Sequence, residues 1–210
     1  MGNEKILCIY DGSSQDGLLA AAMVKKNWVE NQEPLPGEEK KAILETGNKV
    51  AGYSGSIKFV AWKKTDILPT FDTFDRIILL NVTFNNDVMK RLYKAFKKRL
   101  SWYECDSERL SMIEDTKTEK GSLLNLIDGI RGDIYSVSEM LWIAYNNDLI
   151  YTPEFMTMIA QFYCKDHAQL HSRGKVWDFV NSINMRIKSF NDWYEVLWMT
   201  KEQQNKFLNI

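Results

Sequence analysis

The sequence predicts an α/β fold, in which a Rossmann-like parallel sheet of about five strands is flanked by helices and followed by a helical C-terminal part. Short apolar runs alternate with amphipathic segments through the first 135 residues, which is the pattern of strand–helix–strand units. The run IILL (77–80) is wholly apolar, as expected for a strand that is buried on both faces of a parallel sheet. Beyond residue 135 only helical patterns follow.

The first predicted strand is KILCIY, near the N-terminus. The predicted strands span residues 5–10, 57–64, 75–84, 99–105 and, as a short fifth strand, 122–130. We expect the α/β domain to occupy residues 1–135 and the helical part, residues 136–210, to pack on it as one structural unit. Residues 30–56 are rich in proline, glycine and charge, which predicts an exposed loop.

The predicted helices start at recognisable capping residues. Asn85 and Asn86 precede a helix that runs to about residue 98, and Ser136 with Glu139 has the spacing of a capping box. Thr152 followed by Pro153 indicates another helix start. The expected helices span residues 16–30, 87–98, 136–147, 152–171, 175–188 and 191–208.

Composition limits the class of protein. The chain has 210 residues, of which 45% are hydrophobic and 26% are charged, with a net charge of −1; it is therefore able to bury a core and has no strongly basic surface for coating nucleic acid. No apolar run approaches the roughly 20 residues that cross a bilayer, so we expect no membrane partner. The cysteines Cys8, Cys105 and Cys164 are odd in number and widely spaced, which indicates free thiols and a cytoplasmic location.

Three polar segments follow predicted strands, at residues 10–17, 81–84 and 104–107. Because ligands of open α/β sheets bind outside the carboxyl ends of the strands, these segments form the candidate site. Its candidate ligand- or phosphate-binding residues are Asp11, Ser13, Ser14, Asp16, Gly17 and Asn81.

The order of these segments resembles the DHH phosphoesterase superfamily, in particular its branch of nano-RNases and cyclic-nucleotide phosphodiesterases. IYDGSSQDGLLAAAMVKK (9–26) is similar to the family's strand, His-x-Asp-x-Asp-Gly turn and alanine-rich helix. IILLNVTF (77–84) lies where the family has Asp-Val-Ser, and WYECDSE (102–108) lies where it has Asp-His-His. SVSEMLWIAY (136–145) is similar to its Ser-x-x-Glu-Leu-x-Trp helix, and residues 155–167 occupy the region of a ligand-bearing helix.

The resemblance implies an ancestral site in which two Mn²⁺-type ions activate a water for phosphoester hydrolysis. Asp16 is the one ligand clearly retained. The other ligand positions fall on Asp11 or Gly12, Ser14, Asn81, Glu104-Cys105-Asp106, and Gln161 or Tyr163. The sequence contains no Gly-Gly pair, so the resemblance also implies that the family's C-terminal substrate-binding domain, with its Gly-Gly-Gly-His motif, is missing.

Two interpretations of the remaining oxygen groups stay open. Asp11, Asp16, Asn81, Glu104 and Asp106 offer the hard ligands that suit Mg²⁺ or Mn²⁺, so one ion would bind if all five converge. Alternatively, they are ordinary polar residues at strand ends, and Asp16 simply favours the start of a helix. No cofactor is then needed.

A phosphate site without a metal is a further option at the first of these segments. Ser13, Ser14 and the N–H groups at the start of the first helix offer donors to such a group.

Two other patterns have competing explanations. Cys164, His167 and His171 share one face of a predicted helix, as in a metal site, although a half-buried cysteine beside two surface histidines explains them too. Aromatic residues in the C-terminal helices, with basic neighbours, are typical of base stacking, of a protein contact or of a helical core. These residues are Trp177, Phe179, Phe190, Trp193, Tyr194 and Trp198, with Arg173, Lys175, Arg186 and Lys188.

The leading hypothesis is a degenerate, non-catalytic DHH-like protein that binds a nucleotide, a short oligonucleotide or a protein partner. The second is a divergent Mn²⁺- or Mg²⁺-dependent phosphodiesterase acting on short oligonucleotides or cyclic nucleotides. The third is a structural subunit that self-associates or joins a larger assembly.

Overall fold

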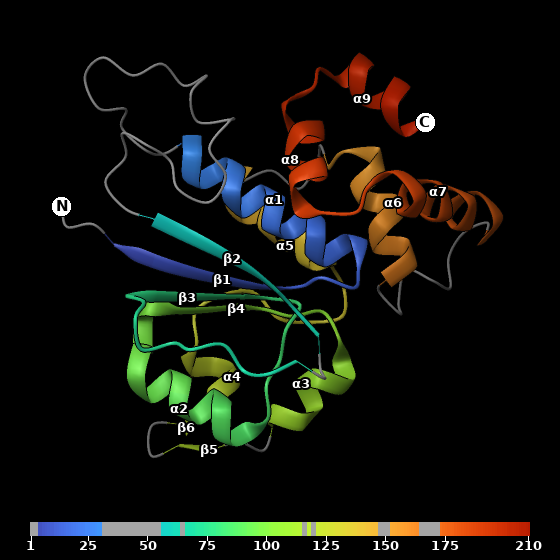
Figure 1. Ribbon diagram of the computed structural model, residues 1–210. Helices are drawn as coiled ribbons and strands as arrows, with labels where there is room; N and C mark the ends of the chain where they lie inside the picture. Colours follow the sequence, from blue (N-terminus) through green and yellow to red (C-terminus); the bar gives the residue numbers. More distant parts are fainter. Residues whose placement is uncertain are drawn as a thin grey trace, which may run out of the picture.

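The computed structural model describes residues 4–30, 56–63, 66–114, 117–118, 121–146, 152–163 and 173–210. A parallel sheet of four strands lies at its centre, in the order β2-β1-β3-β4 (Figure 1). The strands are β1 (Lys5–Asp11), β2 (Ser56–Trp62), β3 (Arg76–Leu80) and β4 (Leu100–Tyr103). The predicted α/β fold with a parallel, Rossmann-like sheet is confirmed.

Helices cover both faces of the sheet (Figure 1). One face carries α1 (Gln15–Glu30), α5 (Val137–Asn146), α6 (Glu154–Tyr163), α7 (Arg173–Arg186) and α8 (Phe190–Trp198), followed by α9 (Lys201–Leu208). The other carries α2 (Asn86–Phe96), the 3₁₀ turn η2 (Lys97–Arg99), α3 (Ser107–Glu114) and α4 (Leu123–Leu126) beside the small hairpin β5 (Lys117–Thr118) and β6 (Gly121–Ser122). None of the helices in the described ranges is long and apolar enough to span a bilayer.

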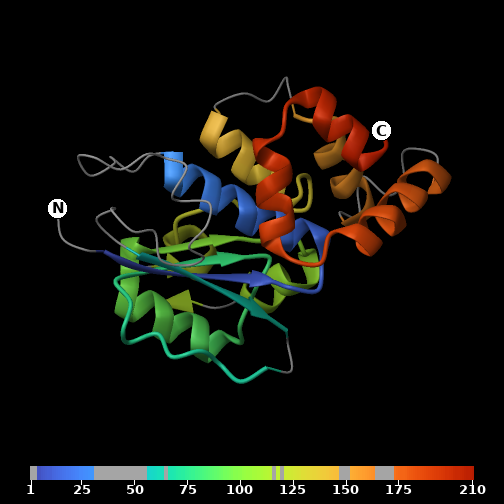
Figure 2. The same ribbon diagram turned by 45° about the horizontal axis from the view of Figure 1, so that its top comes forward.

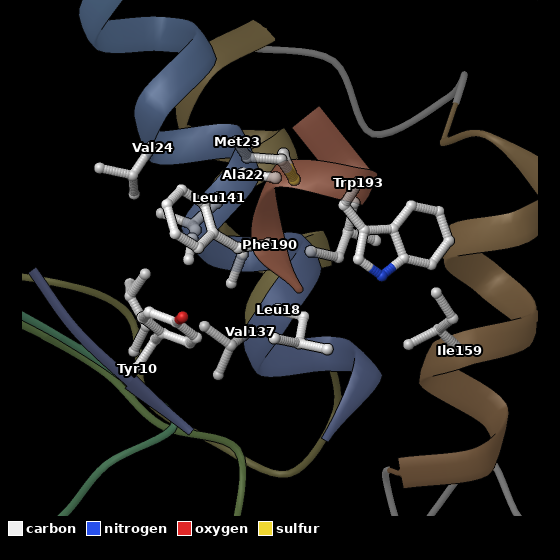
Figure 3. Packing of buried hydrophobic residues seen from close by; sticks show 14 of the residues in the cluster. Tyr10, Leu18, Ala22, Met23, Val24, Val137, Leu141, Ile159, Phe190 and Trp193 are labelled. Atoms are coloured by element: carbon white, nitrogen blue, oxygen red, sulfur yellow. The ribbon is translucent and has the colours of Figure 1, made fainter. Parts of the chain in front are cut away.

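The side chains of β1 alternate between two hydrophobic clusters, one on each face of the sheet. Cys8 and Tyr10 face α1, while Leu7 and Ile9 face α2. On the α1 side, the C-terminal helices complete the cluster (Figure 3). There the ring of Phe190 in α8 stacks on Phe59 of β2 with centroids 4.7 Å apart. Burial of these aromatic and aliphatic groups is what attaches the helical part to the sheet.

The predicted fifth strand, residues 122–130, is wrong. Residues 123–126 form α4 instead, and the chain then makes only single parallel bridges to β4, between Ser101 and Asp128 and between Glu104 and Arg131. The Arg131 guanidinium donates to carbonyl oxygens of Trp102, Leu124 and Ile127. One side chain therefore ties this segment both to β4 and to the end of α4.

The predicted helix starts are confirmed where they are described. Asn85 Oδ1 accepts from the N–H of Val88, and Ser136 and Glu139 exchange the two bonds of a capping box. The C-terminal segment is divided into α8 and α9, because Thr200 and Gln203 form a further capping box. The predicted loop over residues 30–56 and the second half of the predicted helix 152–171 lie outside the described residues.

Gly129 provides a test of how the segment after α4 lies against β4. Its φ is +119°, and a Cβ there would come 2.2 Å from the carbonyl oxygen of Trp102. We expect Gly129→Ala to lower the free energy of unfolding by about 3 kcal/mol, because backbone strain adds to a steric clash. Gly132 is the matched control, since its φ is +148° but no atom lies within 4 Å of such a Cβ. Equal losses in urea denaturation of Gly129→Ala and Gly132→Ala would contradict the close approach.

Candidate functional site

A pocket of about 300 Å³ opens at the carboxyl ends of β1, β2 and β3. The strand order reverses between β1 and β3, and this switch point is where open α/β sheets bind ligands. We call this hollow the sheet-end pocket. Its walls include Asp11, Ser13, Trp62, Lys63, Asn81 and Arg109.

Arg109 of α3 lies among the predicted metal ligands. Its guanidinium nitrogens are each 3.6 Å from a carboxylate oxygen of Asp11, Glu104 and Asp106. It also donates a hydrogen bond to the backbone carbonyl of Asn81. Four of the five predicted metal-ligand residues therefore surround a side-chain cation. We refer to Arg109 and these four residues as the arginine cluster, whose other members are Asp11, Asn81, Glu104 and Asp106.

The backbone at the end of β3 presents the Asn81 carbonyl to Arg109. Asn81 has a φ of +55°, a left-handed conformation that asparagine adopts more readily than most residues. Its own N–H remains bonded to the carbonyl oxygen of Tyr103. The chain thus leaves the sheet at Asn81, and the predicted strand 75–84 is shortened to Arg76–Leu80.

Glu104 is fully buried, and its carboxylate is occupied by donors from its own surroundings. Thr83 Oγ1 donates to one oxygen at 2.7 Å, and the N–H groups of Cys105 and Asp106 donate to the other at 3.1 and 3.0 Å. Burial raises the pKa of Glu104, whereas the charge of Arg109 and the Thr83 hydrogen bond oppose that rise.

Asp106 is tied to α3 in the same manner as an N-cap. Its Oδ1 accepts from the N–H groups of Glu108 and Arg109 at 2.8 and 3.3 Å. Burial lowers the pKa of the Arg109 guanidinium, but the charges of Glu104, Asp11 and Asp106 outweigh burial and raise that pKa above its usual value. Arg109 is therefore a fixed cation.

Asp16 lies apart from the arginine cluster. Its side chain has no solvent exposure, and it accepts from the N–H groups of Val137 and Ser138 at 2.9 and 3.0 Å and from Ser138 Oγ at 2.6 Å. It therefore caps the N-terminus of α5. Burial raises the pKa of Asp16, and the hydrogen bonds from Ser138 and Val137 offset part of that rise.

The candidate phosphate-binding donors at the start of α1 bond within the protein. The N–H and hydroxyl of Ser13 both donate to Asp11, and the N–H of Gly17 donates to Ser14 Oγ at 3.0 Å. A Cβ at Gly17 would lie 2.2 Å from the carbonyl oxygen of Asp11, so this glycine allows α1 to begin directly against β1.

The predicted metal ligands do not fit a metal site. Asp16 and Glu104 have both carboxylate oxygens engaged by protein donors, and the Arg109 guanidinium lies between the other groups. Within the described ranges, no group of three or more His, Cys, Asp or Glu side chains is placed to hold an ion. Cys164, His167 and His171 lie outside those ranges.

The remaining candidates have other surroundings. Tyr163, at the family's helical ligand position, accepts from the N–H of Gln15 at 3.2 Å through its hydroxyl. Most of the C-terminal aromatic residues are core, so the base-stacking interpretation is wrong for Phe179, Phe190, Trp193 and Tyr194. Trp177 and Trp198 are exposed.

The sequence did not predict the roles of Arg109 and Gln15. Arg109 stands three residues after Asp106 in the first turn of α3, a spacing at which a basic side chain reaches back to a capping acid. Gln15 is buried, accepts from Trp193 Nε1 at 2.8 Å and donates to Asn184 Oδ1 at 2.8 Å. No local pattern predicts this role, because the partners of the Gln15 side chain follow more than 160 residues later in the chain.

Comparisons of the chain with protein-family models, with curated proteins and with solved structures find no match.

The hydrogen bonds of Asp16 predict the effect of a nearly isosteric change. Asp16→Asn replaces one acceptor oxygen by an NH₂ group that faces the N–H groups of Val137 or Ser138. We expect a loss of about 2 kcal/mol in the free energy of unfolding, since a buried donor is left unpaired. The matched control is Asp87→Asn, an exposed acid in the first turn of α2, which should cost less than about 0.5 kcal/mol. A neutral Asp16→Asn in urea denaturation would contradict the capping role.

Proposed function

We propose that this protein is a non-catalytic relative of the DHH phosphoesterases that binds a nucleotide in the sheet-end pocket without metal ions. One observation carries the proposal: the Arg109 guanidinium stands among the residues that correspond to the family's metal ligands. An internal cation balances carboxylates that a metal ion would otherwise balance. It supplies no activated water, so binding without hydrolysis follows.

The lining of the sheet-end pocket supports a phosphate-bearing ligand with a ring. Among the described residues that line the pocket, Lys63 and Arg109 are cations and Asp11 is the one carboxylate. The lining therefore has one positive charge in excess. Lys63 is exposed at the rim, whereas Arg109 is already paired. Lys63 is therefore assigned to the phosphate.

The apolar part of the same pocket supports a base. The Trp62 ring meets Phe84 edge-on with centroids 5.0 Å apart and lines the pocket with Val82 and Met112. Aromatic side chains stack on bases with little regard to sequence. A volume of about 300 Å³ is at the lower limit for ligand pockets, which favours one nucleotide over an oligonucleotide. Among the described residues, Cys8 and Cys105 are buried and form no disulfide bond, which supports a cytoplasmic location.

Lys63→Gln tests ligand binding. In calorimetry with the four nucleoside monophosphates and EDTA, we expect at least one to bind to the wild type. Lys63→Gln should weaken that binding about tenfold, because one charge-assisted hydrogen bond is lost. Lys58→Gln is the matched control, since Lys58 is exposed on β2, the strand that Lys63 directly follows, but lies outside the pocket. Absence of binding by every nucleotide, or equal effects of the two variants, would overturn the nucleotide proposal and favour a protein partner.

Arg109→Met tests the internal cation. The side chain keeps a similar length but leaves Asp11, Glu104 and Asp106 without their counter-ion, so we expect a loss of about 2 kcal/mol in stability, less than for a fully buried pair because Arg109 is partly exposed.

Metal titration of the same variant separates the two hypotheses. Millimolar Mn²⁺ should raise the melting temperature of Arg109→Met, because its unpaired carboxylates then have a cation to bind, and should leave the wild type unchanged. A wild-type melting temperature that rises with Mn²⁺, together with release of phosphate or nucleotide from dinucleotides, would instead establish a divergent phosphodiesterase.

A further inference from the structure

A second pocket, of about 230 Å³, lies at the other end of α1, between α1, α5, α8 and α9. These helices lie on the side of the sheet that carries the C-terminal part, in blue, yellow and red in Figure 2. We call this hollow the helix pocket. Its walls include Lys26, Glu30, Trp142, Asn146, Phe155 and Gln204.

Aromatic rings form part of the helix pocket and are held rigidly. Phe155 is buried and stacks on Trp193 with centroids 5.6 Å apart and an interplanar angle of 18°. Trp142 is half-buried and packs against the core cluster. A rigid wall of rings favours a flat ligand, since stacking is then gained with little loss of side-chain freedom.

Two amide side chains present anchored acceptors at this wall. Asn146 donates through Nδ2 to the carbonyl oxygen of Trp142 at 2.9 Å, and Gln204 donates through Nε2 to the carbonyl oxygen of Val196 at 3.0 Å. Each amide is thereby oriented by its NH₂ group. Within the described part of the chain neither side-chain oxygen receives a hydrogen bond, so both are available to N–H donors of a ligand.

The charges of the helix pocket cancel. Lys26 and Glu30 form an ion pair one helical turn apart, and the Lys26 ammonium lies 4.8 Å from the centroid of the Trp198 ring. Among the described residues that line the pocket, Lys26 and Glu30 are the two that carry a charge. The pocket therefore offers no net charge to a phosphate, in contrast to the sheet-end pocket.

We propose that the helix pocket binds an uncharged, planar ring compound that carries an exocyclic amino group, the chemical class of adenine and cytosine. The half-buried ring of Trp142 covers its face, and the oxygens of Asn146 and Gln204 accept from the amino group and ring N–H. A volume of about 230 Å³, below the range of drug-sized ligands, suits one such ring system. This site is independent of the proposed nucleotide site.

Adenine and hypoxanthine distinguish this proposal from unspecific stacking. The two compounds have nearly the same shape, but hypoxanthine replaces the amino donor by a carbonyl acceptor. In calorimetry on the full chain, we expect adenine to bind at least tenfold more tightly than hypoxanthine, because a carbonyl facing the two amide oxygens leaves acceptors unpaired. Equal affinities, or no binding of adenine at millimolar concentration, would overturn the proposal.

Variants locate the binding. Gln204→Leu removes the acceptor at similar volume and should weaken adenine binding about tenfold, with Lys206→Gln as the control on the same helix. Lys63→Gln should leave adenine binding unchanged, and a loss there would place adenine in the sheet-end pocket and refute the helix pocket. Melting temperatures establish that each variant is folded.

Discussion

The hydrogen bonds between the Asp16 carboxylate and the first turn of α5 set the position of the helical part, which burial of apolar side chains then attaches to the sheet. A carboxylate without solvent exposure needs donors, and the first N–H groups of a helix need acceptors. Asp16 and the N–H groups of Val137 and Ser138 satisfy both needs across more than 120 residues of sequence. Because α5 is thereby fixed beside α1, the following helices are directed over the same face of the sheet.

In the arginine cluster, Arg109 offsets the repulsion between carboxylates at the edge of the sheet where the strands end. Three carboxylates converge where parallel strands end, and without a cation their mutual repulsion would oppose folding. A metal ion can be lost or exchanged, whereas Arg109 is covalently part of α3 and stays charged. The side-chain cation therefore favours folding at all metal concentrations. A guanidinium differs from a metal ion in one chemical respect, since it cannot coordinate and activate a water molecule as a Lewis acid does.

Much of the fold could be predicted from the sequence, because strand burial and helix capping are local signals. The apolar run at residues 77–80 and the cap at Asn85 are examples. The predicted fifth strand was wrong because residues 123–126 form a helical turn and the segment after it meets β4 only at isolated bridges, which the apolar pattern does not reveal. At the site, the strand ends were identified correctly, but the sequence could not distinguish a metal ligand from a helix cap at Asp16. That distinction depends on where Ser138 lies.

The rigidity of α1 determines how the two pockets relate. Gln15 and Asp16 fix its first turn, and Lys25 is buried beneath α8, where its ammonium lies 4.3 Å from the Tyr194 ring and donates to Asn191. A helix of 16 residues is about 24 Å long, so one small ligand cannot touch both ends. Ligand-driven coupling requires an element with two packed arrangements, and a helix fixed at its start and along its buried face offers none. We therefore expect the ligands proposed for the sheet-end pocket and the helix pocket to bind independently of each other.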